Sequence, residues 1–242
     1  MTAPSPDPHP LDGHLAVVTG ASRGIGRATA RTLAHLGATV VAGARSEADL
    51  AALAAEHPRL YALPLDVADP ASLRTFATAV HEAHGAIDVL VANAGIGAFG
   101  PIEATTLEDW DRVFDVNVRG TFLIVQAFLA DLRARRGHVV VVSSDVSART
   151  FAGGALYTAS KHAQRAFARA LQMETAADGV RVTEIRPGVV ATAFAEGTER
   201  PADEGALESA DVAEAIAFAL MRPTRLRIDE LQLHPMGQTP EY

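Results

Sequence analysis

The stretch Leu15-Ala16-Val17-Val18-Thr19-Gly20-Ala21-Ser22-Arg23-Gly24-Ile25-Gly26 decides the fold of this 242-residue chain. A short apolar run leads into a glycine-rich turn, and the turn opens a helical pattern from Gly24 to Leu36. Strand, glycine turn and helix together point backbone N–H groups and the positive end of a helix at a phosphate. Glycines let the main chain turn tightly and approach a pyrophosphate closely. The order predicts a nucleotide site, although a glycine-rich turn can also be purely structural.

Apolar runs and helical patterns alternate along the rest of the chain. A continuous apolar run such as His138–Val142 suits a strand that is buried on both faces. Strands that alternate with helices imply right-handed crossovers and a parallel sheet. We therefore predict an α/β fold, a single doubly wound (Rossmann-type) parallel seven-stranded sheet with helices on both faces. Strands are expected near residues 15–19, 39–43, 60–65, 87–91, 138–142, 180–185 and 228–233, and helices near residues 24–36, 47–56, 70–84, 106–135, 155–177 and 209–221.

Composition narrows the class of protein. The chain has 21 basic and 29 acidic residues, a net charge of −8, which disfavours nucleic acid and anionic membranes as partners. Cysteine is absent, which excludes disulfides, thiolate metal sites and thiol nucleophiles. The nine histidines show no metal-ligand spacing, so no metal site is predicted.

Length and the two ends of the chain suggest one domain. The length suits a single large α/β domain, expected over residues 13–242. Residues 1–12 are expected to be a disordered lead-in, because the proline-rich start lacks the basic and apolar regions of a signal peptide. Charged or polar residues interrupt every apolar stretch before it reaches membrane-spanning length. We therefore expect a soluble cytoplasmic protein that has no membrane partner.

The run Tyr157-Thr158-Ala159-Ser160-Lys161 contains the only lysine of the chain, and the other twenty basic residues are arginine. Lysine carries a compact charge and arginine a planar fork, so a lone lysine indicates a place where arginine does not suffice. Four residues apart on a helix, Tyr157 and Lys161 share one face. The ammonium is expected to lower the pKa of the phenol toward neutrality, which makes the phenol a proton donor or acceptor. A solvated helix face is the other interpretation of such a pair.

Seven motifs in a fixed order resemble those of the short-chain dehydrogenase/reductase family. The resemblance covers nearly the whole chain after the first dozen residues. Within the family, Gly153–Tyr157 and the tail Ile228–Gln238 resemble the NADP-dependent 3-hydroxy acid (serine-type) dehydrogenases. Besides the glycine turn, the motifs are Asp66-Val67, Asn93-Ala94-Gly95, Asn117, Ser143-Ser144, the pair Tyr157 and Lys161, and Pro187-Gly188.

The resemblance implies four catalytic residues, Asn117, Ser144, Tyr157 and Lys161. Tyr157 would exchange the proton, and Lys161 would lower its pKa and hold the nicotinamide ribose. Ser144 would bond the substrate oxygen, and Ser143 would be a structural neighbour. Asn117 would hold a water that links Lys161 to solvent, or would bond the main chain near a helix kink; both roles are compatible.

Charges near the second predicted strand indicate which nicotinamide cofactor is used. NAD enzymes of this fold usually place an acid there for the ribose 2′-OH. Here Ala44 stands in that position, Arg45 follows it, and Arg23 lies in the glycine turn. Two guanidinium groups suit a 2′-phosphate, although either can be a solvated surface group. We therefore predict that NADP(H) is favoured over NAD(H).

The resemblance extends the cofactor site to later loops. Asp66 would accept from the adenine amino group, or would simply end a strand. Asn93 would support the ribose side, and Val190 and Thr192 would contact the carboxamide end. The expected cofactor-binding residues are Gly20, Ser22, Arg23, Gly24, Ile25, Gly26, Arg45, Asp66, Val67, Asn93, Ala94, Gly95, Tyr157, Lys161, Pro187, Gly188, Val190 and Thr192.

The implied function is hydride transfer between NADP(H) and a small hydroxy or carbonyl substrate, such as a 3-hydroxy acid or a related aldehyde or ketone. One alternative is a 3-oxoacyl-carrier-protein reductase-like enzyme, although the tail lacks the Gly-Gly pair that usually ends those enzymes. Another alternative is a non-catalytic NADP-binding regulatory protein. The acidic segment from Ala193 to Glu208 is expected to be either a lid over the substrate or a solvated loop.

Two predicted helices resemble those that pair subunits in this family. They are the helices near residues 106–135 and 155–177, so a homotetramer or homodimer is expected. The first carries an apolar stripe broader than one sheet contact needs, part of which must be core. The stripe consists of Phe114, Val118, Phe122, Val125, Phe128, Leu129 and Leu132.

Overall fold

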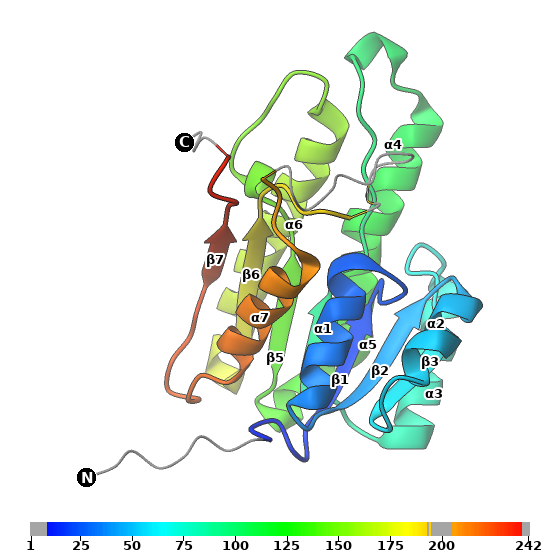
Figure 1. Cartoon of the computed structure of the whole chain (residues 1–242), viewed down its shortest axis with the longest axis vertical. Coiled ribbons are helices and arrows are strands. Elements are labelled where there is room, and N and C mark those ends of the chain that lie inside the picture. The colour runs from blue at the N-terminus through cyan, green and yellow to red at the C-terminus, as the bar shows by residue number, and fades with distance from the viewer. Residues whose placement is uncertain (1–8, 193, 195–204, 239–242) are drawn as a thin grey trace.

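A computed structural model describes residues 9–192, 194 and 205–238. Its centre is a sheet of seven parallel strands in the order β3-β2-β1-β4-β5-β6-β7 (Figure 1). This order confirms the predicted doubly wound sheet. The strands are β1 (Leu15–Thr19), β2 (Thr39–Ala44), β3 (Leu60–Pro64), β4 (Val89–Ala92), β5 (His138–Val142), β6 (Arg181–Pro187) and β7 (Glu230–Leu233).

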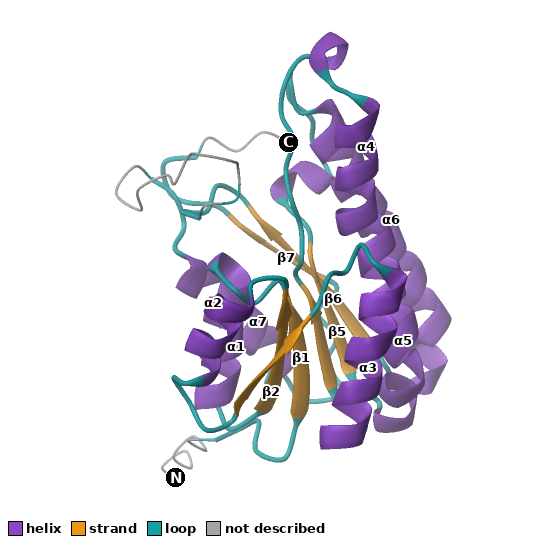
Figure 2. Cartoon of the chain, turned by 90° about the vertical axis from the view of Figure 1, so that its right-hand side faces the viewer, coloured by secondary structure: helices purple, strands orange, loops and turns teal. Residues whose placement is uncertain are grey.

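Helices cover both faces of the sheet, and the view along its edge separates the two layers (Figure 2). One layer contains α1 (Gly24–His35), α2 (Glu47–Ala54) and α7 (Ser209–Leu220). The other contains α3 (Pro70–His84), α4 (Leu107–Phe114), α5 (Gly120–Arg135) and α6 (Ala155–Thr175). The described residues also form short 3-10 helices, which are η1 (Ile102–Ala104), η3 (Asp145–Ser147) and η4 (Ala176–Asp178).

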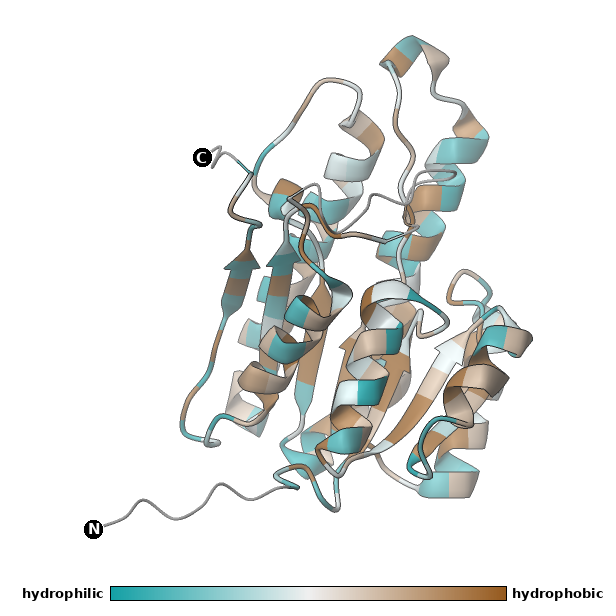
Figure 3. Ribbon diagram, in the orientation of Figure 1, coloured by the Kyte–Doolittle hydropathy of each residue, from teal (hydrophilic) through white to brown (hydrophobic). Residues whose placement is uncertain are grey.

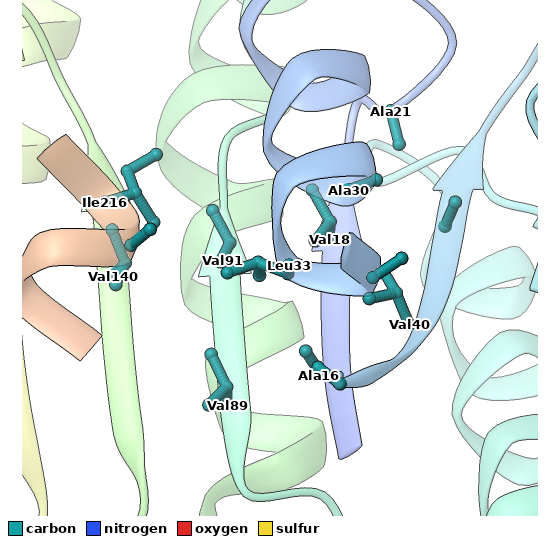
Figure 4. Close-up of a cluster of buried hydrophobic side chains, with 14 of the residues drawn as sticks. Ala16, Val18, Ala21, Ala30, Leu33, Val40, Val89, Val91, Val140 and Ile216 are labelled. Carbon is teal, nitrogen blue, oxygen red and sulfur yellow. The ribbon is translucent and has the colours of Figure 1, made fainter. Parts of the chain in front are cut away.

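The core consists of two hydrophobic layers, one on each face of the sheet. Successive residues of a strand point to opposite faces, so Val40 belongs to one layer and Val41 to the other. Leu33 of α1 and Ile216 of α7 pack over the central strands in the first layer (Figure 4). The central strands β1, β4 and β5 are therefore apolar along most of their length, whereas β6 and β7 include polar residues, as the hydropathy colouring shows (Figure 3).

The long helix predicted near residues 106–135 is interrupted. A π-helical segment, η2 (Asp115–Arg119), lies between α4 and α5. The amide of Asn117 turns away from the helix, donating to Ile96 O at 2.9 Å and accepting from Ile96 N at 2.8 Å. Such π segments often occur at functional sites. The bonds to Ile96 are those expected for the main-chain role of Asn117 near a helix kink, although the apolar periodicity continues through the segment and does not indicate its π geometry.

The same helical stretch, Leu107–Arg135, is long and apolar enough to cross a membrane by length and composition. Phe128 and Leu132 of α5 are fully buried against the sheet, so part of its apolar character belongs to the core. Phe122 is 45% exposed. The predicted stripe is therefore partly core and partly surface.

The packed domain begins earlier than residue 13. Leu11 is buried in the first core layer, and its N–H donates to Leu36 O at 3.0 Å. The predicted disordered lead-in over residues 1–12 is therefore wrong for Leu11, because this apolar side chain packs in the core layer that contains α1. Residues 1–8 lie outside the described part of the chain.

Candidate active site

A cavity of about 880 Å³ opens at the carboxyl ends of the strands. Parallel strands end at one edge of the sheet, so the loops after β1, β4, β5 and β6 meet there. Every predicted cofactor-binding residue except Gly26 lines this cavity, and so do the predicted catalytic residues Ser144, Tyr157 and Lys161. Asn117 does not line it.

The glycine turn forms one wall of the cavity. Gly20 and Gly24 have φ values of 67° and 55°, which L side chains rarely adopt. A Cβ on Gly26 would lie 2.3 Å from Gly20 O, so this glycine serves the packing of α1 on the turn. The first turn of α1 has no acid and no side-chain cap. Its N–H groups therefore suit an anionic ligand, as predicted for a pyrophosphate.

The end of the cavity beside β2 carries two guanidinium groups. Arg23 and Arg45 line it together with Ala44, as the sequence suggested. Asp49 also lines this end and was not anticipated there. Asp66 follows β3, where its carboxylate accepts from Ala68 N at 2.9 Å. The local charge favours an anion, with Asp49 as an opposing group.

The loop after β4 is fixed by hydrogen bonds to β1. The amide of Asn93 donates to Thr19 O at 2.9 Å, and the N–H groups of Asn93 and Ala94 both donate to Thr19 Oγ1 at 3.0 Å. Asn93 thus joins the glycine turn to the next loop. A Cβ on Gly95 would lie 3.5 Å from Lys161 Nζ, so this loop also approaches the predicted catalytic lysine closely.

Tyr157 and Lys161 lie on α6, with Nζ 5.7 Å from the centroid of the phenol ring. Ser144 lines the same cavity from the end of β5, and its hydroxyl lowers the pKa of the phenol. Lys161 is only 2% exposed and donates to Val142 O at 3.2 Å and Gln164 Oε1 at 2.8 Å. The fold therefore brings together three groups that the sequence separates.

Burial governs the protonation of this pair. Burial raises the pKa of Tyr157 well above 10, the Ser144 hydrogen bond lowers it by less, and the charge of Asp145 raises it further. Burial also lowers the pKa of Lys161 to about 7, against a raising effect of Glu184. The predicted lowering of the Tyr157 pKa is therefore wrong in this structure, because desolvation of the phenolate outweighs the favourable contacts.

Asn117 lies outside the cavity lining and is connected to Lys161 through other side chains. Its carbonyl oxygen accepts from Thr121 Oγ1 at 2.7 Å, and Thr121 in turn accepts from Gln164 Nε2 at 2.8 Å. Gln164 bonds Lys161, so a line of side chains joins the lysine to the main chain of η2. The side-chain amide of Asn117 also donates to Ser160 Oγ at 3.0 Å. Gln164 and Thr121, which were not predicted, thus connect Lys161 to Asn117, and the expected water between Lys161 and solvent stays a prediction.

Ser143 has a structural role, as expected. Its hydroxyl donates to Glu184 Oε1 at 2.5 Å, and Ser147 donates to the same oxygen at 2.9 Å. Glu184 is 2% exposed and is one of the charged groups beneath the site. Both serines line the cavity, but Ser144, one residue later, is the one whose hydroxyl lowers the pKa of the Tyr157 phenol.

The end of the cavity beside Tyr157 is aromatic. The ring of Phe99 lies 5.3 Å from that of Tyr157, and the ring of Phe194 lies 5.5 Å from it on another side. Phe151 is 6.1 Å from Phe99. The sequence analysis missed all three phenylalanines, because they come from loops without a motif. Most of the predicted acidic lid, residues 193 and 195–204, lies outside the described residues.

An ion pair borders the same end. Arg149 donates through Nε and a terminal nitrogen to Asp145 Oδ2, at 3.0 Å and 2.6 Å. Both residues line the cavity. Neither residue was predicted at the site, although the position of Asp145 directly after Ser144 indicates that Asp145 lies close to it.

Comparison with known proteins gives a consistent result. Residues 14–203 match the family described as short chain dehydrogenase. The structure is similar to an alcohol dehydrogenase from the archaeon Thermococcus sibiricus complexed with 5-hydroxy-NADP, with 39% identity, a TM-score of 0.89 and coverage of 95% of this chain and 99% of that one. It is also similar to serine dehydrogenase from Escherichia coli, with 30% identity, a TM-score of 0.85 and coverage of 93% and 100%.

A curated relative is longer than this chain. Glycine betaine reductase ATRR of Emericella nidulans is 37% identical over 243 residues, which cover 95% of this chain and 19% of that protein. This chain thus spans about a fifth of the length of that relative.

Proposed function

This chain belongs to the short chain dehydrogenase family, and on that premise we propose that it transfers a hydride between NADP(H) and a small hydroxy or carbonyl compound. The enzyme is an oxidoreductase that acts on CH–OH groups. The observation that carries the proposal is the convergence of Ser144, Tyr157 and Lys161 at one end of a cavity that has the glycine turn at the other.

The residues of the cavity fit a dinucleotide. The uncapped start of α1 and the turn at Gly20 and Gly24 would hold the pyrophosphate. Arg23 and Arg45 would hold a 2′-phosphate, which supports NADP(H) over NAD(H). When bound, the nicotinamide supplies a hydride to the carbonyl carbon or accepts one from the carbinol carbon.

The protein's own groups handle the proton. In reduction, Tyr157 donates its phenolic proton to the substrate oxygen; in oxidation, the phenolate takes the proton back. Ser144 lies beside the phenol and would bond the same oxygen. Lys161, held by Val142 O and Gln164, would place its charge near the phenol and the ribose hydroxyls.

The substrate end supports a small molecule with an apolar side. Phe99, Phe151 and Phe194 offer aromatic surface, and Arg149 places a guanidinium at the same end. A 3-hydroxy acid such as serine would bring its carboxylate toward that guanidinium, and related aldehydes and ketones would contact the rings. The 3-oxoacyl-carrier-protein reductase-like activity and a non-catalytic NADP-binding role are the alternatives.

A cofactor titration followed by turnover tests the proposal. NADPH and NADH fluorescence titrations measure affinity, and a panel of 3-hydroxy acids, small aldehydes, small ketones and a 3-oxoacyl thioester measures activity. We expect tighter NADPH binding and the highest kcat/KM on a small substrate. Preference for the thioester would favour the carrier-protein alternative, and tight binding without turnover of any substrate would favour the regulatory one.

A further inference from the structure

Asp145 connects the catalytic serine to three other parts of the site. Its carboxylate is almost fully buried, with 4% of the side chain exposed. Oδ1 accepts from Ser144 Oγ at 3.0 Å. Oδ2 accepts from Arg149 and from Gln238 Nε2 at 2.8 Å, and lies 3.6 Å from His234 Nε2. A buried carboxylate surrounded by donors is an acceptor for all of them.

The bond to Asp145 determines how Ser144 meets the phenol. A serine hydroxyl has one proton, and in this structure that proton points to Asp145 at 3.0 Å. Ser144 also lies beside Tyr157, and its hydroxyl lowers the pKa of the phenol, which is the effect of a donor placed to bond the phenolate. Asp145 and the Tyr157 phenolate therefore compete for the single proton of the Ser144 hydroxyl, and in this structure the carboxylate holds it at 3.0 Å.

We propose that Asp145 is a positioning residue that orients the hydroxyl of Ser144 and, through its charge, moves the working range of Tyr157 to higher pH. This inference rests on the proposed function, because it assumes that Tyr157 exchanges the proton. Asp145 acts through Ser144 and Tyr157, and no step requires it to touch the substrate. Its negative charge disfavours the phenolate, which agrees with its raising effect on the pKa of Tyr157.

Other charged groups face this cluster from each neighbouring element. Arg149 balances the charge of Asp145 from within the same loop, and His234 approaches from the segment after β7. Arg186 of β6 donates to Asp145 O at 3.2 Å, the buried Glu184 of β6 accepts from Ser143, and Lys161 of α6 lines the cavity. Removing the charge of Asp145 should lower the pKa of Tyr157, and removing the charge of Arg149 should raise it.

Two substitutions test the charge effect with opposite expected signs. Asp145→Asn keeps the shape and the acceptor for Ser144 but removes the charge, so the rise of kcat/KM for alcohol oxidation with pH should move down by about one pH unit. Arg149→Gln leaves Asp145 unbalanced, so the same rise should move to higher pH. Asp229→Asn, an exposed acid before β7, is the control and should leave the profile unchanged. Superimposed wild-type and Asp145→Asn profiles would overturn the charge effect.

A double-mutant cycle tests the positioning effect. Asp145→Ala, which removes the acceptor for Ser144, should lower the plateau kcat about tenfold in the wild-type background and have little effect on it when Ser144 is already alanine. An equal loss in both backgrounds would show that Asp145 does not act through Ser144.

A readout without substrate separates this inference from the proposed function. The chain has three tyrosines, so a 13C label at Cζ gives three signals, and Tyr157→Phe assigns the relevant one. This signal should begin to titrate at lower pH in Asp145→Asn than in the wild type, and an unmoved signal would count against Asp145. Absence of turnover by the wild type would reject the proposed function while this titration still tests the role of Asp145. If Asp145→Asn fails to fold by circular dichroism, Arg149→Gln decides the sign.

Discussion

Lys161 Nζ lies 5.7 Å from the centroid of the Tyr157 ring, and the lysine side chain is enclosed by protein. Val142 O and Gln164 Oε1 accept two hydrogen bonds from the ammonium. The only lysine in the chain therefore occupies a space that is fixed on several sides. A planar guanidinium cannot place its charge at the same point.

Lys161→Arg should lower kcat at least ~100-fold although the net charge is unchanged. The larger group is expected to destabilise the fold by about 1–3 kcal/mol as well, because the space is buried. Steady-state kinetics on the best carbonyl substrate and urea unfolding measure the two effects. Near-normal turnover would show that arginine does suffice at this position.

Tyr157→Phe should reduce kcat at least as much as Lys161→Arg, because it removes the proton that is exchanged. Combining the two substitutions should cost little more than Tyr157→Phe alone, since residues that act as a unit are non-additive. Independent, multiplying losses in the same kinetic assay would show that the two side chains act separately.

Replacing Arg23 and Arg45 by glutamine should remove most of the preference for NADPH over NADH, about 2–4 kcal/mol for two charge-assisted contacts. Both arginines are exposed, so the preference should also weaken as salt is added. Fluorescence titration with each cofactor measures it. The matched control replaces Arg74 and Arg225, exposed arginines outside the cavity lining, and should leave the preference intact. Equal affinity of the unmodified protein for both cofactors would contradict the prediction.

The fold was predictable because its signals are local. Strands β1, β4 and β5 are nearly continuous apolar runs, and the glycine turn after β1 needs backbone conformations that few other residues adopt. Residues that follow strand ends must meet at one edge of a parallel sheet, so Ser144 and Pro187 could be placed near each other without a structure.

The parts that were missed depend on contacts between distant segments. Gln164 bonds Lys161 on α6 but also Thr121 on α5, and no spacing in the sequence indicates that pair. A kink near Asn117 was expected, but its π geometry and the main-chain partner Ile96, 21 residues away, were not. The direction of the Tyr157 pKa was wrong for a related reason, because the degree of burial follows from packing and not from the Tyr-x-x-x-Lys spacing.

His138 should make the protein sensitive to acid. It is 2% exposed on β5, and burial lowers its pKa from 6.5 to about 3. Between these values the unfolded chain binds a proton that the native state does not, so the free energy of unfolding should fall as pH falls, by at most ~1.4 kcal/mol per pH unit. Urea unfolding at pH 7 and pH 5 measures this loss, and His138→Gln should reduce it. An identical loss in the variant would assign it to other groups.

The protein should be a homotetramer or homodimer that pairs through α4, α5 and α6. Trp110 and Phe122 are 46% and 45% exposed, and Met173 of α6 is 82% exposed. Light scattering at micromolar concentration should give a multiple of the 25.4 kDa chain mass, and Phe122→Glu should shift it toward monomer. Phe218→Glu, on the exposed side of α7, is a control that should not change the mass. A monomeric wild type would count decisively against the proposal.

Gln164→Leu should lower kcat about tenfold while the protein still binds NADPH. The substitution removes the acceptor of one Lys161 hydrogen bond and the donor to Thr121, so the ammonium loses the side chain that fixes its direction. Thr121→Val keeps the bond from Lys161 to Gln164 but removes both bonds of Thr121 Oγ1, the one from Gln164 Nε2 and the one to Asn117 O, and should have a smaller effect on kcat. Steady-state kinetics and a cofactor titration on both variants measure the difference. If Thr121→Val costs as much as Gln164→Leu, the link to Asn117 matters as a whole; if neither changes kcat, the bonds to Val142 O and the surrounding packing are enough to hold Lys161.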